Sequence, residues 1–438
     1  MPAFDFTRRT RHPSDPDVVV VGAGPAGLAA ARTLTGQGLT VQVLEAQAHL
    51  GGRMATQELD GFRIDHGVQL FNTDHPEPAR RLDLDRLDLR PLAPGVLVHS
   101  AGRRYRVGDP QQTPARQAAA RGPLGSPLDK ARLAATLGRL AATPAPRLLA
   151  RPETSAARAL ADRGLGARTV DGFLRPLLGA LLADPALTTS SRVADLVLRS
   201  YARGRLCLAA GGAGSVPEQL AEGLPADCVR LGVAVTGIAA DGVETARHGR
   251  IGASAVVLAC DARSAAALLP GLRVPGFHPV TTFYHAADRS PLGEPSLLLD
   301  ADSSGVSHSL VLSDVHPSYA PAGRALIATT VLGRRSYEAG GPAGFEPVVR
   351  RRLAELYGAP TRSWEFLSVR HLPDAVPAMP APHHLRRSVR LLAGLYVCGD
   401  HRDTSSLQGA LVSGRRAARA VLRDLGLDTA AASADVAA

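Results

Sequence analysis

The stretch from Asp17 to Arg53 constrains the fold of this chain more than any other. Val18 to Val21 form a continuous run of β-branched apolar residues, which is typical of a strand buried on both faces. A G-x-G-x-x-G pattern follows, and the Ala- and Leu-rich stretch from Pro25 to Thr35 predicts a helix. A second apolar run, Thr40 to Leu44, ends at the acidic Glu45. The stretch therefore predicts a complete β-α-β unit.

Each glycine of the pattern has a mechanical role. Gly22 allows a tight turn after the strand, Gly24 lets the backbone approach a pyrophosphate, and Gly27 lets the helix lie close to the sheet. The helix points its free N–H groups and its positive dipole end at the phosphates. Glu45 can accept hydrogen bonds from an adenosine ribose, and its charge repels a 2′-phosphate. The unit therefore predicts a dinucleotide ligand other than NADP.

Gly51, Gly52 and Arg53 lie just beyond the acid, where a simple NAD dehydrogenase has no need of them. With these residues, the stretch resembles the N-terminal signature of the flavin-containing amine oxidase superfamily, which includes phytoene desaturases and protoporphyrinogen oxidases. The resemblance implies FAD as the cofactor, with Arg53 at its diphosphate. A guanidinium fork beside a phosphate is also sound chemistry in itself.

A second motif lies near the C-terminus. Leu395 to Cys398 predicts a strand, Gly399 and Asp400 its turn, and Leu407 to Leu422 a helix. The segment closely resembles the closing signature of the same superfamily. The resemblance implies that Asp400 meets the ribityl or diphosphate part of FAD, and that Gln408, Gly409 and Ala410 lie at a helix N-terminus facing the flavin. The positive end of that helix would lie near flavin N1 and the C2 oxygen, and the small residues would let the ring approach.

Two further segments are expected to contact the cofactor. Asp65, His66 and Gly67 resemble the D-x-G segment that passes close to the flavin ring in this superfamily, so Gly67 is the expected backbone contact. His66 is a weak candidate for proton transfer near neutral pH. Hydride transfer to a flavin often needs no protein base, so no catalytic residue is assigned. A strand expected from Val229 to Ile238 would bring the backbone of Val235 to the adenine, within one residue of register.

Together these motifs give one set of expected cofactor-binding residues: Gly22, Gly24, Pro25, Ala26, Gly27, Glu45, Ala46, Gly52, Arg53, Gly67, Val68, Val235, Gly399, Asp400, Gln408, Gly409 and Ala410.

The chain departs from the superfamily pattern at two places. Members that attach FAD covalently have a cysteine in the closing segment, where this chain has Ser405, Ser406 and Leu407, so FAD is expected to bind non-covalently. Amine oxidases of the superfamily tend to use a lysine near flavin N5. Lys130 is the only lysine here and lies in an expected helical insertion, which weighs against amine oxidation.

The motifs predict an α/β fold, with a doubly wound Rossmann-like FAD-binding domain and an interleaved α+β substrate domain. The FAD domain is expected from residues 17–75, 205–265 and 385–427, and the substrate domain from 76–204 and 266–384. The ends, 1–16 and 428–438, are expected to be disordered. Apolar residues of the helical insertion either line an apolar substrate cavity or pack in the core of the domain. The glycine-rich run from Gly211 to Ser215 is either a cofactor contact or a structural turn.

Composition excludes several other classes. The formal net charge is +10, but the arginines are evenly spread and basic clusters lack interleaved aromatic residues, which disfavours nucleic-acid binding. The sequence neither supports nor excludes peripheral contact with a membrane. The four cysteines have no metal-ligand spacing and fit a reducing cytoplasm. No run of 18 apolar residues predicts a membrane span.

These observations predict an FAD-dependent oxidoreductase. It would take a hydride from a C–N or C–C bond of a small or apolar substrate, with oxygen, a quinone or another acceptor to reoxidise the flavin. Two alternatives share the fold. One is an isomerase that holds reduced FAD without net redox change, and the other is a non-catalytic flavin- or NAD-binding protein.

Overall fold

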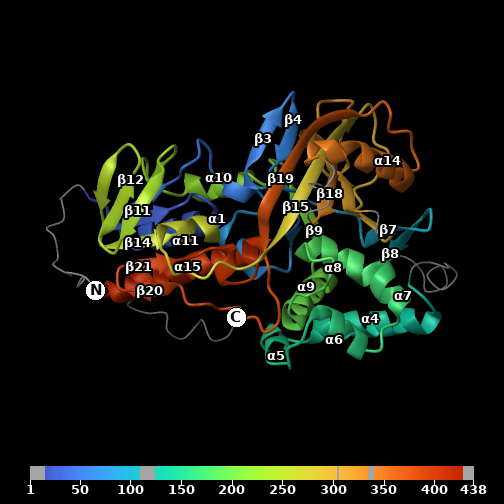
Figure 1. The fold of residues 1–438 in the computed structure, drawn as a ribbon, viewed down its shortest axis with the longest axis horizontal. Helices are drawn as coiled ribbons and strands as arrows, with labels where there is room; N and C mark the ends of the chain where they lie inside the picture. Colours follow the sequence, from blue (N-terminus) through green and yellow to red (C-terminus); the bar gives the residue numbers. More distant parts are fainter. Residues whose placement is uncertain (1–14, 109–123, 303–304, 334–339, 428–438) are drawn as a thin grey trace.

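The computed structural model describes residues 15–108, 124–302, 305–333 and 340–427. The expected disordered ends lie outside these residues, except for residues 15 and 16. Figure 1 shows the first sheet, with helices α1, α11 and α15, at one end of an elongated molecule. The second large sheet and helices α4 to α9 lie at the other end.

The first sheet is a six-stranded, mostly parallel sheet built from segments far apart in the chain. Its strand order is β10 (Val229–Arg230), β2 (Val41–Leu44), β1 (Val18–Val21), β14 (Ala255–Leu258), β21 (Leu395–Val397) and β20 (Arg390–Leu392). The first five strands run parallel, and β20 is antiparallel to its neighbour. The doubly wound sheet predicted from the glycine pattern is confirmed.

Both faces of this sheet are covered, which explains why β1 is apolar at every position. Helices α1 (Pro25–Thr35), α10 (Ser215–Glu222) and α15 (Leu407–Asp424) share one core with Val18 and Val20. Helix α11 (Ala262–Leu268) packs on the opposite face, with a three-stranded antiparallel sheet of β11 (Val235–Ala239), β12 (Gly242–Thr245) and β13 (Gly249–Gly252). The backbones of α1 and α15 approach so closely that a side chain at Gly414 would meet the carbonyl of Ala26.

The single strand expected from Val229 to Ile238 is wrong. The segment forms β10 and β11, which belong to different sheets. Gly232 adopts a φ of +70° between them, and its N–H donates to the carbonyl of Gln47. A left-handed residue breaks the strand, and glycine adopts that conformation without strain.

The second large sheet has seven strands. Their order is β19 (Glu365–Pro377), β15 (Phe277–Ala287), β18 (Ala325–Leu332), β17 (Val306–Val311), β16 (Leu298–Asp300), β7 (Val96–Ser100) and β8 (Arg103–Val107), and only the β16–β7 pair is parallel. One face packs against the helical insertion, and the other against α14 (Glu346–Tyr357). The insertion contains α4 (Pro127–Ala142), α5 (Ala145–Leu149), α6 (Ala156–Asp162), α7 (Ala167–Thr169), α8 (Arg175–Leu182) and α9 (Ser191–Arg203).

Smaller elements join the two parts. The hairpin of β3 (Thr56–Leu59) and β4 (Phe62–Asp65) turns at Asp60 and Gly61, both with positive φ, as the Asp-Gly pair predicts. A three-stranded sheet combines β5 (Phe71–Asn72), β9 (Leu206–Ala209) and β6 (Leu89–Pro91). Helix α2 (Pro76–Arg81) packs against α15. Across the described residues, no helix combines the length and the apolar character needed to span a bilayer.

Candidate functional site

A cavity of about 1950 Å³ runs from the carboxyl ends of β1 and β2 to the face of the seven-stranded sheet. Most of the expected cofactor-binding residues line it: Gly22, Gly24, Pro25, Ala26, Glu45, Ala46, Gly52, Arg53, Gly67, Val68, Val235, Gly399, Asp400, Gln408 and Ala410. Gly27 and Gly409 do not. The cavity also reaches β15, β17, β18 and helices α8 and α9, so nucleotide-binding and apolar surfaces share one space.

The glycines after β1 form an open turn at one end of this cavity. Gly22 has a φ of +109°. A Cβ at Gly24 would meet no protein atom within 4 Å, so this backbone is bare toward the cavity at the N-terminus of α1. A Cβ at Gly27 would instead collide with the carbonyl of Gly22. Gly27 therefore serves close helix packing, and Gly24 leaves a cradle suited to a pyrophosphate.

Glu45 fixes the turn as well as facing the cavity. Its Oε2 accepts the N–H of Ala23 at 2.8 Å, and its Oε1 accepts the N–H of Gln47 at 2.9 Å. A carboxylate offers about four acceptor positions. The two oxygens can therefore accept ribose hydroxyl groups while they keep these backbone bonds.

Arg53 and Asp400 form a bidentate ion pair that joins the two sequence motifs. Arg53 Nη1 donates to Asp400 Oδ2 at 2.8 Å, and Nη2 donates to Oδ1 at 2.7 Å. Nη1 also donates to the carbonyl of Ala375 at 2.6 Å. Both side chains line the cavity, so the guanidinium neutralises a carboxylate that would otherwise repel a diphosphate.

The N-terminus of α15 meets the cavity at Gln408 and Ala410. Ser406 caps the helix and accepts the N–H of Gly409 at 3.2 Å, while Gln408 Oε1 accepts the N–H of Glu77 at 2.8 Å. A Cβ at Gly409 would collide with the carbonyl of Thr404. The lack of a side chain at Gly409 therefore serves this tight turn, and Gly409 itself does not line the cavity.

Asp65 is a buried acid that organises the chain beside the cavity. Its Oδ1 accepts hydrogen bonds from Thr56 Oγ1 at 2.5 Å and from the N–H of Ala213 at 3.0 Å. Burial raises the pKa of Asp65 to about 6. Gly212 leaves no room for a side chain against Thr56 and Asp65, and residues 211–215 do not line the cavity. The glycine-rich run is thus placed as a structural turn in this structure.

His66 lines the cavity and stacks edge-on against His49, with 5.5 Å between the ring centroids. Burial, followed by the charge of Arg370, lowers the pKa of His66, so the imidazole is neutral near pH 7. A neutral ring can accept a proton.

The far half of the cavity is largely aliphatic. Helices α8 and α9 contribute Leu181, Leu196 and Val197, so part of the insertion lines the cavity while residues such as Leu177 pack the core. The sheet adds Val280, Leu332 and Leu372. Phe71 provides the sole phenyl, phenol or indole ring among the described lining residues, and Lys130 lies outside the cavity in α4.

Three polar residues of this half were not anticipated from the sequence: Thr282, His308 and Thr330. Each lies in a strand of mixed composition without a local motif. Only the strand register, which brings distant segments side by side, shows that they form a group.

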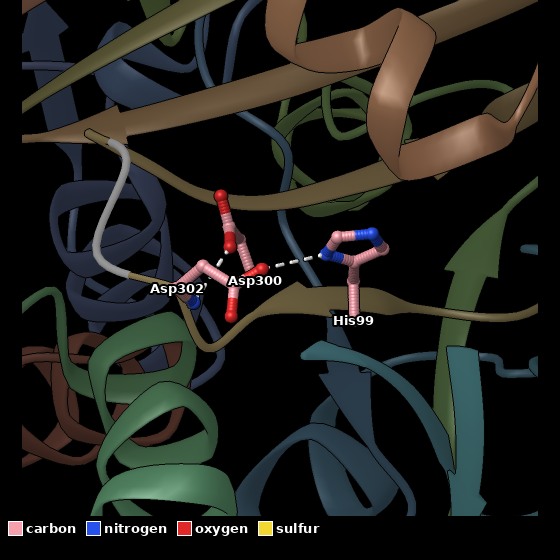
Figure 2. A group of neighbouring side chains, drawn as sticks. All are labelled: His99, Asp300 and Asp302. Carbon is pink, nitrogen blue, oxygen red and sulfur yellow. Dashed lines mark hydrogen bonds and ion pairs between the residues drawn. The ribbon is translucent and has the colours of Figure 1, made fainter. Parts of the chain in front are cut away.

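His99, Asp300 and Asp302 are close enough together to suggest a metal site (Figure 2). Arg352 already binds this group: its guanidinium donates to Asp300 at 2.7 Å, to Asp302 at 2.9 Å and to His99 Nδ1 at 3.2 Å. A cation thus balances both carboxylates, and the group is outside the cavity. It is best explained as an ion-pair network that ties α14 to strands β16 and β7 of the sheet.

The residues present fit FAD. The bare turn at Gly24, the N-terminus of α1, the ribose acceptor Glu45 and the Arg53–Asp400 pair lie along one wall of the cavity. The cavity is larger than the roughly 300–1000 Å³ of a typical small-ligand pocket, so it has room for a dinucleotide and a substrate together.

Comparison with known proteins agrees with this geometry. Residues 25–422 match the model of the family described as flavin containing amine oxidoreductase. Putrescine oxidase of Kocuria rosea is 54% identical over 61 residues, which are 14% of this chain and 13% of that protein. Carotenoid 3,4-desaturase of Haloarcula japonica is 41% identical over 85 residues, 17% of each chain. These matches thus span under a fifth of the relatives' length.

Solved structures share the fold over most of the molecule. An oxidoreductase from Methanosarcina mazei superposes with a TM-score of 0.73 and 17% identity, covering 91% of this chain and 99% of that one. The family model covers most of the chain, from Pro25, directly after the glycine turn, to Leu422 within the closing helix α15. This chain belongs to the flavin-containing amine oxidoreductase family.

Proposed function

We propose that this chain is an FAD-dependent oxidoreductase that binds FAD non-covalently and removes a hydride from a C–N or C–C bond of an apolar substrate. Oxygen, a quinone or another acceptor would take up the electrons. The observation that carries the proposal is the continuous cavity, which joins a nucleotide-binding turn at Gly24 to an aliphatic surface on the seven-stranded sheet.

FAD, when bound, supplies the two-electron chemistry. The chain's own residues supply position and electrostatics. Arg53, held by Asp400, would face the diphosphate, and the N-terminus of α15 would place a positive dipole end at the cofactor. The aliphatic half would exclude water from the substrate. His66, neutral and on the cavity wall, is the candidate to accept a proton.

The lining favours C–C over C–N oxidation. A cationic amine is stabilised by carboxylates or by aromatic faces. On β15, β17 and β18 the described lining residues include neither, and lysine is absent from the cavity. Glu45 and Asp400 belong to the nucleotide half, and Asp74, which lines the cavity beside α9, is already paired with Arg199 and Arg203.

Non-covalent binding is supported by the positions of the cysteines. Residues 403–410 of the closing segment contain none. Cys207, Cys228 and Cys398 are buried, and Cys260 lines the cavity near Glu45, at the nucleotide end. Burial raises the pKa of Cys260 to about 12, so its thiol is unreactive near neutral pH.

The visible absorbance spectrum of the purified protein, repeated on the supernatant after acid precipitation, tests this proposal. A flavin spectrum that moves into the supernatant is expected. Anaerobic bleaching of the bound flavin by polyenes or amines would then identify the substrate class. A colourless protein that cannot be reconstituted with FAD would overturn the proposal, and colour that stays with the precipitate would overturn non-covalent binding.

A further inference from the structure

Three polar side chains form a row across the seven-stranded sheet. Thr282 of β15 pairs with Thr330 of β18, and Thr330 pairs with His308 of β17. Paired residues of neighbouring strands present their side chains on the same face of a sheet. All three residues line the cavity, so the row faces the space shared with the nucleotide-binding turn.

The surroundings of this row are apolar. The next residues on the same face, Tyr284, Ala328 and Leu310, lie in the buried core. In the other direction along the strands, the next residues on this face are Val280 and Leu332, which pair with each other and line the cavity. No charged residue of β15, β17 or β18 lines the cavity within the described chain. The row is therefore an uncharged polar strip on an aliphatic wall.

The strip has few hydrogen bonds of its own. His308 is only 8% exposed, and its one bond joins Nδ1 to Ser307 Oγ at 3.2 Å. Within the described chain no hydrogen bond joins its Nε2 or the hydroxyl groups of Thr282 and Thr330, and none of these atoms is among the fully buried polar atoms that lack a partner, so they open onto the cavity. Burial lowers the pKa of His308 to about 4, so the ring is neutral at physiological pH.

Polar groups that open onto a cavity can bind water when the cavity is empty and can exchange that water for a polar group of a ligand. A neutral imidazole nitrogen either donates or accepts, and each threonine hydroxyl does both. Such a strip matches a hydroxyl or carbonyl group. It offers no counter-charge to an ammonium or a carboxylate, whose desolvation would oppose binding.

We propose that Thr282, Thr330 and His308 form a substrate subsite that binds a neutral hydroxyl or carbonyl group on an otherwise hydrocarbon substrate. The inference rests on the proposed function, because it places the substrate in the same cavity as FAD. It names the substrate class: a largely aliphatic molecule with an uncharged oxygen, held by that oxygen at the sheet.

Three ten-carbon ligands test the subsite: 1-decanol, decylamine and decanoate. Their dissociation constants are measured by calorimetry on FAD-loaded protein at pH 7.5. We expect 1-decanol to bind tightest. Net hydrogen bonds of about 1 kcal/mol correspond to about a fivefold change, so His308→Leu and Thr330→Val should each weaken 1-decanol about fivefold and leave decylamine unchanged.

Two further variants control for folding and for general loss of cavity shape. His308→Gln keeps a polar group and should retain most of the affinity for 1-decanol. His248→Leu changes an exposed histidine on the β12–β13 turn and should behave as the unmodified protein.

The outcomes separate the two proposals. The FAD content of the protein is measured first, and a protein that binds no FAD counts against the proposed function. With FAD bound, tighter binding of decylamine or decanoate overturns the subsite. Equal affinity of His308→Leu and the unmodified protein for 1-decanol also overturns it, because the strip would then be merely hydrated.

Discussion

The Arg53–Asp400 pair gives the sharpest test of how the nucleotide half works. The sequence motifs suggest two separate contacts with FAD, whereas the structure joins them through two hydrogen bonds of 2.7 and 2.8 Å. The carboxylate is well buried, with 10% of its side chain exposed, and the guanidinium is about one-third exposed. The two residues should therefore act on FAD as a unit, and a double-mutant cycle measures this coupling.

The expected magnitudes follow from the geometry. Arg53→Met would remove the charged hydrogen bond proposed to the FAD diphosphate. Hydrogen bonds to charged groups contribute about 1.5–3 kcal/mol, and the lower end applies here because the guanidinium is partly exposed. The substitution also leaves the Asp400 carboxylate facing a phosphate, which adds a similar cost. We expect FAD affinity to fall about 100-fold, since each 1.4 kcal/mol is about tenfold.

Asp400→Asn weakens the hold on Arg53 without leaving a buried charge, so about a tenfold loss is expected. In the double variant the repulsive carboxylate is gone. Its FAD affinity should then be no worse than that of Arg53→Met alone.

Flavin fluorescence quenching during FAD titration of the apoprotein gives the four dissociation constants. Arg104→Met, at an exposed arginine of β8, is the matched control and should leave the constant unchanged. Independent contacts would multiply to about a 1000-fold loss in the double variant, and that result would refute the pair as a unit.

Three further predictions concern single residues. Burial raises the pKa of Asp65 to about 6, from 3.8, so as pH rises the unfolded chain loses this proton before the folded protein does. The free energy of unfolding should therefore fall by about 3 kcal/mol between pH 4 and 6 and then stay level. Asp65→Asn should remove this dependence in melting curves taken across that range, and an unchanged pH profile would contradict it. Gly409→Ala should destabilise by about 1–3 kcal/mol through its clash with the Thr404 carbonyl, whereas Gly138→Ala, within α4 and free of contacts, should stabilise slightly in the same thermal assay. Lys130→Met should leave kcat unchanged with any substrate found, because Lys130 is outside the cavity, and a large loss of kcat would restore a catalytic lysine.

The sequence predicted the parallel sheet and the helices at both of its ends because their determinants are local. A buried strand, a glycine turn and an alanine-rich helix lie within residues 18–35, and each has its own pattern. The same is true of Leu395 to Asp424. The prediction for Val229 to Ile238 failed because one glycine with positive φ, Gly232, divides the segment.

The function of individual glycines was harder to predict than their presence. Gly24 and Gly409 look alike in the sequence, since both lie at the start of a helix. Space around them differs: a Cβ at Gly24 would meet nothing within 4 Å, and one at Gly409 would meet the carbonyl of Thr404. Whether the space beside a glycine is open to a ligand or filled by a backbone carbonyl depends on the surrounding residues, which are not part of the motif.

The substrate half shows the same limit more strongly. Thr282, His308 and Thr330 are up to 48 residues apart and come together only because β15 and β17 both pair with β18. A shift of one residue in either register would turn a side chain to the α14 face of the sheet. The residues expected to bind the cofactor lie in short turns, so they form local sequence motifs. The residues proposed to bind the substrate come together through long-range strand pairing, on a sheet whose strands otherwise need only be apolar. The cofactor of this chain was therefore predictable from its sequence, and its substrate class had to be inferred from the fold.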